Sequence, residues 1–297
     1  MESGISGKTR VCGIFGYPLE HTFSPVIHNA AFNELGLNYI YVPFPVKPGN
    51  LRVAVEAVRA FELAGVNVTI PHKEAVIPFL DELSQEAGII GAVNTIVNRE
   101  GKLRGENTDG LGFIRSLQEK TGFDPAGREA LILGAGGAAR AVAIQLALAG
   151  AGKLLLANRS PRRAEELAFL ISLKTEVSTT VVPWPDKSGK VLPGDILNGV
   201  DLVVQTTPVG MYPNHMETVP FPFDKLKPGQ IVCDLVYNPV ETQFLKNAGV
   251  SGAFTVDGLG MLLHQGALAF EMWTGVAAPV EVMRKALVRT VLEKDSD

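Results

Sequence analysis

The sequence predicts an α/β protein built from two lobes. Short apolar segments with the character of buried strands alternate with longer helical segments, which predicts mostly parallel sheets. One such series occupies the first third of the chain, and a second series follows it. The chain has 297 residues, of which 46% are hydrophobic, so it can bury the cores of two domains. We expect residues 1–109, completed by helices over residues 258–297, to form one lobe and residues 110–257 the other.

The first lobe is expected to begin with a strand, a loop and a helix. Pro25 suits the first turn of that helix, Ser24 suits its N-cap, and Gly36 follows its expected end. Further apolar segments bounded by Pro, Gly and Asn mark the remaining elements. The expected strands cover residues 11–16, 38–46 and 65–71, and the expected helices cover residues 25–35, 51–63 and 75–80.

Polar side chains stand where these elements end. Thr22 and Ser24 are two hydroxyls beside a helix start, and they can bind a carboxylate or phosphate or act as plain caps. Thr69 and Lys73 come at the carboxyl end of the third strand, where open α/β sheets bind ligands. Lys73 precedes an expected helix whose dipole slightly disfavours a cation, which is a small reason to expect a functional role there. The alternative is a solvated lysine in the first helical turn, the more frequent case for lysines.

The second lobe opens on a glycine-rich turn between an expected strand over residues 130–133 and an expected helix over residues 138–149. Gly134-x-Gly136-x-x-Ala139 fits the dinucleotide-binding fingerprint. The first glycine makes the tight turn, the second lets the backbone approach a pyrophosphate, and the small third residue lets helix and strand pack closely. Because an ordinary strand-to-helix turn gives the same pattern, the fingerprint alone is weak evidence.

The end of the next expected strand, over residues 153–157, distinguishes between two cofactors. An NAD site would carry an acidic residue there for the ribose hydroxyls. This chain carries Asn158 and then three arginines, Arg159 and Arg163 among them. Guanidinium groups match phosphate oxygens in a bidentate manner, so a 2′-phosphate and therefore NADP(H) is favoured. The alternative is a solvated helix start whose arginines pair with two following glutamates.

The rest of the chain is expected to complete the second lobe and then return to the first. Met261 and Gln265 are four residues apart and so share one face of a helix. The cleft between the lobes is the expected active site. Further strands are expected over residues 200–205 and 230–235, a Pro-rich loop over residues 208–228, and a final helix over residues 279–294.

Composition excludes several classes of function. The net charge of −4 gives no overall attraction to nucleic acid or to an anionic membrane. The two cysteines and five scattered histidines form neither a metal-ligand pattern nor a disulfide framework, so we expect no metal. The amino terminus lacks the pattern of a signal peptide, and the longest apolar run is too short to span a bilayer. We therefore expect a cytoplasmic protein, and the sequence leaves its oligomeric state open, a homodimer included.

Eight motifs in order make the chain resemble the shikimate dehydrogenase family. That family comprises NADPH-dependent enzymes that reduce 3-dehydroshikimate to shikimate on the pathway to chorismate and the aromatic amino acids. The motifs are Gly16-x-Pro18-x-x-His21-Thr22-x-Ser24-Pro25-x-x-His28-Asn29, Gly65-x-Asn67-Val68-Thr69-x-Pro71-x-Lys73, Gly91-Ala92-x-Asn94-Thr95, Asn107-Thr108-Asp109-x-x-Gly112, Gly134-Ala-Gly-Gly-Ala138, Asn158-Arg159-Ser160, Asp234-x-x-Tyr237-x-Pro239-x-x-Thr242 and Gly258-x-x-Met261-Leu262-x-x-Gln265-Gly266.

The resemblance implies roles for particular residues. Lys73 and Asp109 would be the catalytic pair. Reduction of a ketone needs a hydride donor and an acid that protonates the developing alkoxide, and a lysine oriented by a carboxylate can supply that proton. The implied substrate-binding residues are Thr22, Ser24, Thr69, Asn94, Asp109, Tyr237 and Gln265. The implied cofactor-binding residues are Gly134, Ala135, Gly136, Gly137, Ala138, Asn158, Arg159, Ser160, Arg163, Leu235, Gly258, Met261 and, on slighter grounds, Gln85.

Four positions depart from the family pattern. Thr22 stands where the family usually has Ser, and its added methyl narrows the pocket expected for the substrate carboxylate. Ser160 replaces a Thr and keeps the hydroxyl. Gln205 replaces a more usual Asn and receives no role, and Gln85 stands where many relatives have an acidic residue near the cofactor.

Two other functions remain open at this point. Thr22 is compatible with a quinate or quinate/shikimate dehydrogenase of the same family. A non-catalytic NADP-sensing module would keep the glycine fingerprint but discard the acid–base pair, and the presence of both Lys73 and Asp109 disfavours it.

Overall fold

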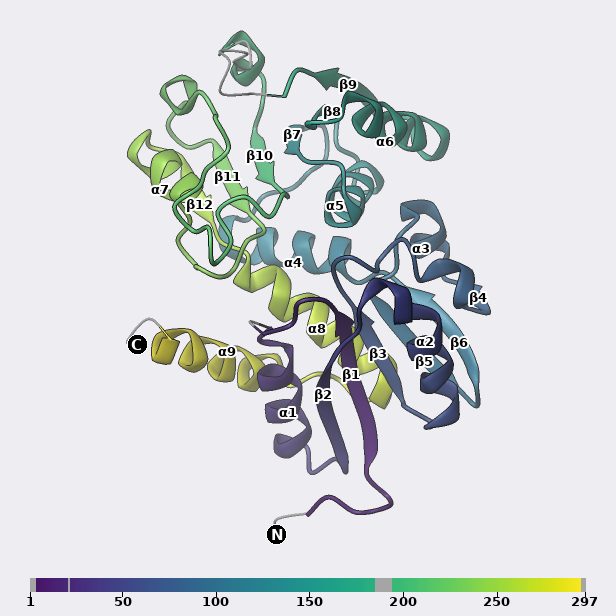
Figure 1. Ribbon diagram of the computed structural model, residues 1–297. Helices are drawn as coiled ribbons and strands as arrows, with labels where there is room; N and C mark the ends of the chain where they lie inside the picture. Colours follow the sequence, from purple (N-terminus) through teal and green to yellow (C-terminus); the bar gives the residue numbers. More distant parts are fainter. Residues whose placement is uncertain (1–3, 21, 185–193, 295–297) are drawn as a thin grey trace. The chain divides into compact units, whose positions relative to one another are not determined.

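The computed structural model describes residues 4–20, 22–184 and 194–294. The chain divides into two compact units, which are Met1–Gly112 with Leu262–Asp297 (unit 1) and Phe113–Met261 (unit 2). Each unit holds a six-stranded sheet with helices (Figure 1), so the expected two-lobed α/β class is confirmed. His21 of the first motif lies outside the described residues.

The sheet of unit 1 combines parallel strands with an antiparallel hairpin. Strands β1 (Arg10–Gly16), β2 (Tyr39–Pro45) and β3 (Gly65–Val68) are parallel, in the order β2-β1-β3. Next come β5 (Thr95–Arg99), β6 (Lys102–Glu106) and the short β4 (Glu82–Leu83). β5 is antiparallel to both β3 and β6. Glu100 and Gly101 turn between β5 and β6 with φ of 55° and 87°, the conformation of a tight hairpin turn, which was not among the elements expected from the sequence.

The helices of unit 1 correct two expectations. Helix α1 (Ser24–Glu34) has Phe23 as its N-cap and Ser24 as its first residue, so Ser24 is not the expected cap. No α-helix forms over residues 75–80, where the chain makes turns and a single 3₁₀ turn, Ile77–Phe79. Lys73 therefore lies in a turn and not at a helix start, so no helix dipole acts on it as expected. The other helices that lie wholly in unit 1 are α2 (Leu51–Ala60), α3 (Gln85–Ile90) and α9 (Val280–Lys294). Helices α4 (Asp109–Thr121) and α8 (Leu259–Thr274) each have residues in both units.

The second half of the first motif stabilises the edge of this sheet. Asn29 on α1 donates from Nδ2 to the carbonyl of Tyr41, and its Oδ1 accepts from the Tyr41 amide, at 2.9 and 2.8 Å. This side chain thus pairs with the edge strand β2 as a neighbouring strand would. The ring of His28 stacks on Tyr41 at 4.4 Å and lies 5.3 Å from Trp273, so helices α1 and α8 and the sheet share one aromatic core.

Unit 2 has the strand order of dinucleotide-binding domains. Its strands are β7 (Glu129–Leu133), β8 (Lys153–Ala157), β9 (Ser178–Val182), β10 (Leu202–Gln205), β11 (Ile231–Asp234) and β12 (Phe254–Val256). They are all parallel and lie in the order β12-β11-β10-β7-β8-β9. Counted from β7 this order is 3-2-1-4-5-6, that of the Rossmann fold, and it reverses direction between β7 and β10. Helices α5 (Gly137–Leu148), α6 (Pro161–Lys174) and α7 (Gln243–Val250) accompany this sheet.

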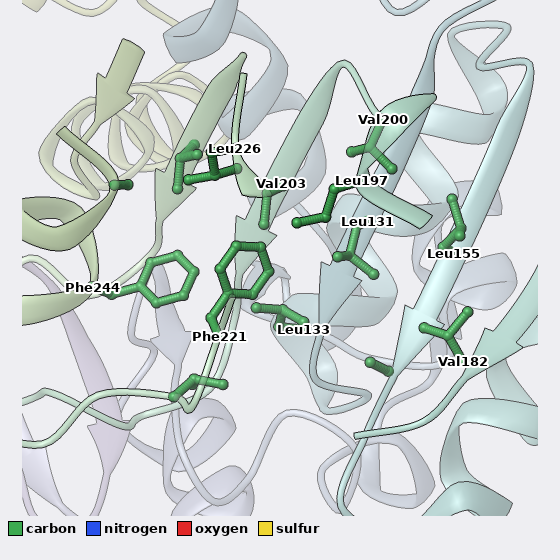
Figure 2. Packing of buried hydrophobic residues seen from close by; sticks show 14 of the residues in the cluster. Leu131, Leu133, Leu155, Val182, Leu197, Val200, Val203, Phe221, Leu226 and Phe244 are labelled. Atoms are coloured by element: carbon green, nitrogen blue, oxygen red, sulfur yellow. The ribbon is translucent and has the colours of Figure 1, made fainter. Parts of the chain in front are cut away.

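The Pro-rich loop contributes to the core of unit 2. Figure 2 shows Phe221, from this loop, and Phe244, from α7, beside side chains of β7 and β10. The two rings meet edge to face with centroids 5.5 Å apart. Burial of these aromatic side chains fixes the long connection between β10 and β11 against the sheet. Over the described part of the chain, no helix is both long and apolar enough to cross a membrane.

Candidate active site

Lys73 is held in a turn that is tied to the sheet of unit 1 on both sides. The amide of His72 donates to the carbonyl of Thr69 at 2.9 Å, which bends the chain directly after β3. The carbonyl of Lys73 accepts from the amide of Val93 at 2.8 Å. The buried ring of His72 adds a contact of 2.7 Å between its Nε2 and the carbonyl of Val46. The backbone from which the lysine side chain extends is therefore well defined.

Asp109 is the first residue of α4, and the residues before it hold it in place. The Asn107 side chain accepts from the amide of Asp109 at 3.1 Å and donates to the carbonyl of Ala92 at 2.9 Å. An acidic side chain in a first helical turn is favoured by the helix dipole. This arrangement explains the spacing of the Asn-Thr-Asp motif, because Asn107 fixes the helix start that presents Asp109.

The two catalytic candidates are in contact. Nζ of Lys73 lies 2.5 Å from Oδ2 of Asp109, and the side chains are 17% and 6% exposed. The other carboxylate oxygen, Oδ1, accepts from Nδ2 of Asn94 at 2.8 Å. With both oxygens engaged, Asp109 can hold the ammonium group in one orientation, and the Lys73 side chain stays partly exposed.

Asn94 connects the pair to the rest of the site. Its Oδ1 accepts from the amide of Thr108 at 2.8 Å, and its Nδ2 also donates to the Thr108 hydroxyl at 2.8 Å. A longer contact of 3.4 Å joins Nδ2 to Oε1 of Gln265 on α8. The close approach of α8 depends on Gly112, since a Cβ at that position would lie 2.7 Å from the backbone nitrogen of Gln265. Unit 1 therefore gathers Lys73, Asn94, Asp109 and Gln265 into one buried polar network.

Asn67 and Thr108 belong to two of the sequence motifs, but the motifs alone implied no role for them. Asn67 donates from Nδ2 to the carbonyl of Asn94 at 3.2 Å and to the Thr95 hydroxyl at 3.0 Å. Its Oδ1 accepts from the hydroxyl of Tyr41 at 2.7 Å. Asn67 and Thr108 thus both hydrogen-bond to Asn94 and help to fix its position. The sequence feature that could have indicated the role of Asn67 is an Asn within an otherwise apolar, buried strand, because a buried polar group needs hydrogen-bond partners.

Of the other substrate-binding candidates, Thr22, Ser24 and Thr69 belong to unit 1 and Tyr237 belongs to unit 2. Thr69 is half-buried directly after β3, and its amide donates to the carbonyl of Phe15 at 2.8 Å. The Thr22 hydroxyl accepts a hydrogen bond from the amide of Ser24 at 3.3 Å, so it provides a partner for the first amide of α1. The side chain of Ser24 is buried. Tyr237 belongs to the loop after β11 in unit 2, and burial raises the pKa of its phenol. Binding of substrate by these residues stays a prediction.

The glycine-rich loop of unit 2, predicted to bind a pyrophosphate, combines a tight turn with open backbone at a helix start. Gly134 has φ of +125°, and a Cβ there would overlap the hydroxyl of Thr206. Gly136 is the N-cap of α5 without a side-chain capping bond, and a Cβ at Gly136 would meet nothing within 4 Å. The first turn of α5 carries no acidic residue. Uncapped amides beside open backbone, next to Ala135, Gly137 and Ala138, are suited to the phosphate oxygens of NADP(H).

The end of β8 carries the residues that are predicted to bind the adenosine 2′-phosphate. Nδ2 of Asn158 donates to the carbonyl of Ser160 at 2.9 Å, and Ser160 is the N-cap of α6. The pairing with a following glutamate that the alternative interpretation expected occurs at Arg162, which contacts Glu166 at 3.1 Å. Among the described residues, Arg159 has no such ion pair and its side chain is exposed. The segment therefore retains a cation at the position that would bind the 2′-phosphate.

Four further cofactor-binding candidates are placed as follows. A Cβ at Gly258 would lie 2.5 Å from the carbonyl oxygen of Leu235, so only glycine lets the segment before α8 pass this close to the loop after β11. Met261 is buried in the first turn of α8. Gln85 is exposed as the first residue of α3 in unit 1. Their contact with cofactor stays a prediction. Within the described residues, no group of three His, Cys, Asp or Glu side chains is placed to hold a metal ion.

Comparison with known proteins gives a consistent result. A family model described as the shikimate dehydrogenase substrate binding domain matches residues 14–96, and one described as the shikimate 5′-dehydrogenase C-terminal domain matches residues 258–288. The chain is 55% identical to a shikimate dehydrogenase (NADP(+)) from Desulforamulus reducens, with 97% of each chain covered. It is similar to a crystal structure of a shikimate dehydrogenase in complex with NADP+, at 44% identity, a TM-score of 0.87 and 97% coverage of each chain. A shikimate 5-dehydrogenase from Listeria monocytogenes, crystallised with shikimate and NAD, is 39% identical with a TM-score of 0.88, covering 97% of this chain and 99% of that one.

Proposed function

The chain belongs to the shikimate dehydrogenase family, and from this we propose that it catalyses the reversible, NADP(H)-dependent reduction of 3-dehydroshikimate to shikimate. This is a step of the pathway to chorismate and the aromatic amino acids. The observation that carries the proposal is the ion pair between Lys73 and Asp109, joined through Asn94 to Gln265. A family member that had lost its activity would not need to maintain this partly buried pair.

Residues of unit 1 would carry out the proton transfer of the reaction. When bound, NADPH supplies a hydride to the carbonyl carbon of the substrate. The Lys73 ammonium group lies at the carbonyl oxygen, stabilises the negative charge that develops there, and transfers its proton to that oxygen. Asp109 holds the ammonium group through Oδ2 and accepts from a ring hydroxyl of the substrate. In the reverse direction, the neutral amine of Lys73 takes the proton from the hydroxyl group of shikimate.

Neutral hydrogen-bonding groups would recognise the rest of the substrate. Shikimate carries three hydroxyls and one carboxylate, and it needs donors and acceptors on several sides of its ring. Asn94, Thr69 and Gln265 bind the hydroxyls, whereas the hydroxyls of Thr22 and Ser24, together with Tyr237, bind the carboxylate. Burial of Ser24 supports this role, because a buried hydroxyl provides a directed donor in a site from which water is excluded.

The cofactor would be bound by unit 2. The backbone amides of Gly136, Gly137 and Ala138 bind the pyrophosphate, while Arg159 and Arg163 bind the 2′-phosphate. The open backbone at Gly136 and the uncapped start of α5 support this placement. A homodimer also stays a prediction, which sedimentation velocity would test.

Quinate is the second candidate substrate, and the observation that favours it is Thr22. Its hydroxyl is directed at the amide of Ser24, so its methyl group changes the shape of the expected carboxylate pocket. One assay separates the alternatives. Absorbance at the nicotinamide band is followed with shikimate or quinate and with NADP or NAD. Turnover only with shikimate and NADP supports the main proposal, turnover with quinate supports the second, and binding without turnover would support a sensing module.

The role of Lys73 is tested by replacing it with methionine, which keeps the length of the side chain but removes the charge and the proton. Because the proton is transferred in the transition state, Lys73→Met should lower kcat by roughly 10²-fold or more, with a much smaller change in substrate affinity. Lys102→Met is the matched control, since Lys102 pairs with Glu82 in the same unit at 2.7 Å but is 63% exposed on the hairpin. The control should keep full turnover. A Lys73→Met enzyme that retained more than about half its kcat would show that the proton comes from another group.

A further inference from the structure

Two buried polar residues of unit 2 have no place in the mechanism above. Gln205 ends β10 and Asp234 ends β11, and the two are directly paired in the register of these neighbouring strands. Both are 0% exposed. A carboxylate rarely lies so deep in a protein without a cation or several hydrogen-bond donors. The partners of this pair therefore indicate what it does.

Gln205 holds the loop that follows β10. Its Oε1 accepts from the amide of Thr207 at 2.5 Å, and its Nε2 donates to the carbonyls of Thr207 and Val209 at 3.0 and 3.1 Å. All three groups belong to the backbone of the loop over residues 206–211, which we call the β10 loop. One side chain thus replaces the backbone pairing that a strand would supply, and it determines the path of this loop.

Asp234 fixes the amide of Gln205 and joins it to a second loop. Its Oδ1 accepts from Nε2 of Gln205 at 3.3 Å and from the amide of Val236 at 3.0 Å. Its Oδ2 accepts from the hydroxyl of Thr242 at 2.7 Å, and that hydroxyl caps α7 through the amide of Leu245 at 3.2 Å. Burial raises the pKa of Asp234 to about 7 even with these three donors. The carboxyl group therefore links the β10 loop to the loop after β11.

The β10 loop lies directly against the glycine-rich loop. Thr206, its first residue, donates from its amide and its hydroxyl to the carbonyl of Leu133, at 2.9 and 2.8 Å. The same hydroxyl fills the space that a Cβ of Gly134 would occupy. β7 and β10 are the neighbours between which the strand order reverses, and this is where Rossmann sheets bind their cofactor.

We propose that Gln205 is a positioning residue for the dinucleotide site: with Asp234 as its buried acceptor, it holds the β10 loop against Gly134 and thereby sets the affinity for NADP(H). This rests on the proposed function, which places the cofactor in unit 2. Gln205 itself does not touch the cofactor. Its loss loosens the β10 loop, so cofactor binding weakens, while binding of shikimate, most of whose proposed contacts belong to unit 1, changes little.

Gln230 provides a matched control for a merely structural effect. It is a buried glutamine in the same sheet, at the amino end of β11. It also makes three hydrogen bonds to backbone groups: it accepts from Lys227 at 2.6 Å and donates to Leu197 and Val200 at 2.8 and 2.6 Å. Replacement of either glutamine by alanine removes a similar number of buried contacts, but only Gln205 is at the carboxyl end of the sheet.

The experiment measures the Kd of NADPH by fluorescence titration, the KM of shikimate and the Tm for the full chain and for Gln205→Ala and Gln230→Ala. We expect Gln205→Ala to raise the Kd of NADPH by about tenfold, which corresponds to the net free energy of about one to two hydrogen bonds. The KM of shikimate should stay within twofold. Gln230→Ala should lower Tm to a similar degree and leave the Kd of NADPH within twofold.

Two outcomes would overturn the proposal: an unchanged Kd in Gln205→Ala, or equal increases in both variants. If Gln205→Ala does not fold, Thr206→Val decides, because it removes the hydroxyl contact to Leu133 at the first residue of the same loop without changing the side-chain shape. A raised Kd for NADPH in Thr206→Val supports the proposal, and an unchanged Kd contradicts it. Failure of the proposed function itself is recognised separately, since the unaltered protein would then not bind NADPH.

Discussion

His28 should make the stability of unit 1 depend on pH. Its ring is completely buried, neither ring nitrogen has a hydrogen-bond partner among the described residues, and it is packed against Tyr41 and Trp273. Burial lowers the pKa of His28 from 6.5 to about 3, because the imidazolium form would lose its hydration without gaining a partner. In the pH range just below 6.5, the ring therefore becomes protonated in the unfolded chain but stays neutral in the folded protein.

The sign and size of the effect follow from these two pKa values. The folded pKa lies below the unfolded one, so the stabilising contribution is fully present above pH 6.5 and is lost as the pH falls towards 3. Between pH 8 and pH 5 the His28 ring takes up a proton in the unfolded state but not in the folded state. Each pH unit below 6.5 lowers the free energy of unfolding by about 1.4 kcal/mol, so the loss at pH 5 is roughly 2 kcal/mol. This figure is insensitive to the folded pKa as long as it stays well below 5.

Urea unfolding at pH 8 and at pH 5 measures the effect. The two tryptophans are Trp184 in unit 2 and Trp273 in unit 1, whose ring lies 5.3 Å from that of His28. In a Trp184→Phe background, tryptophan fluorescence reports on unit 1 alone. The free energy of unfolding is compared between this background and its His28→Phe variant. Other titrating groups contribute equally to both proteins and cancel in the comparison.

The variant should lose about 2 kcal/mol less stability than the background between pH 8 and pH 5. Any change in packing caused by phenylalanine affects both pH values alike, so it does not mimic this result. His28→Gln, which also cannot titrate, should give the same difference. Equal pH dependence in all three proteins would refute the reasoning and would mean that His28 takes up a proton in the folded state.

Three further predictions concern the cofactor, the substrate and the fold. Replacing Arg159 and Arg163 together by alanine should raise the KM of NADPH at least about tenfold and leave that of NADH nearly unchanged, since only NADPH has the 2′-phosphate; equal losses in steady-state assays would remove this assignment. Ser24→Ala should raise the KM of shikimate more than it lowers kcat, as loss of uniform binding does, and an unchanged KM would argue against a contact with the carboxylate. Gly65→Ala should lower the free energy of unfolding by roughly 1–3 kcal/mol or more, because its Cβ would overlap a backbone carbonyl of β5 and the indole of α8. Gly49→Ala, where a Cβ meets nothing within 4 Å, is the control in thermal denaturation and should leave Tm within about a degree.

The sequence determined the parts of the fold in which local pattern and tertiary environment agree. The strand predicted over residues 153–157 is β8, because a parallel strand buried on both faces appears as a continuous apolar run. Pro161 begins α6, as its fixed φ predicts. Conversely, the apolar residues 75–80 were expected to be helical but form turns and one 3₁₀ turn, and Pro78 lacks the amide that an α-helix over these residues would need. The hairpin over β5 and β6 was missed because its turn, Glu100-Gly101, lacks the usual Asn-Gly or Asp-Gly signal.

The resemblance carried by the motifs already implied that Lys73 and Asp109 act as a pair, but it did not show that they are in contact. They are 36 residues apart, and their contact of 2.5 Å exists because β3, β5 and α4 bring two loop ends together around Asn94. Gln205 shows the reverse case: the sequence marked it only as a departure from a family pattern. Sequence alone determines which side chains can donate, accept or carry charge, because that chemistry is local. Which of them meet, and which are buried without an alternative partner, depends on strand order and register, and those are decided by the packing of the whole chain.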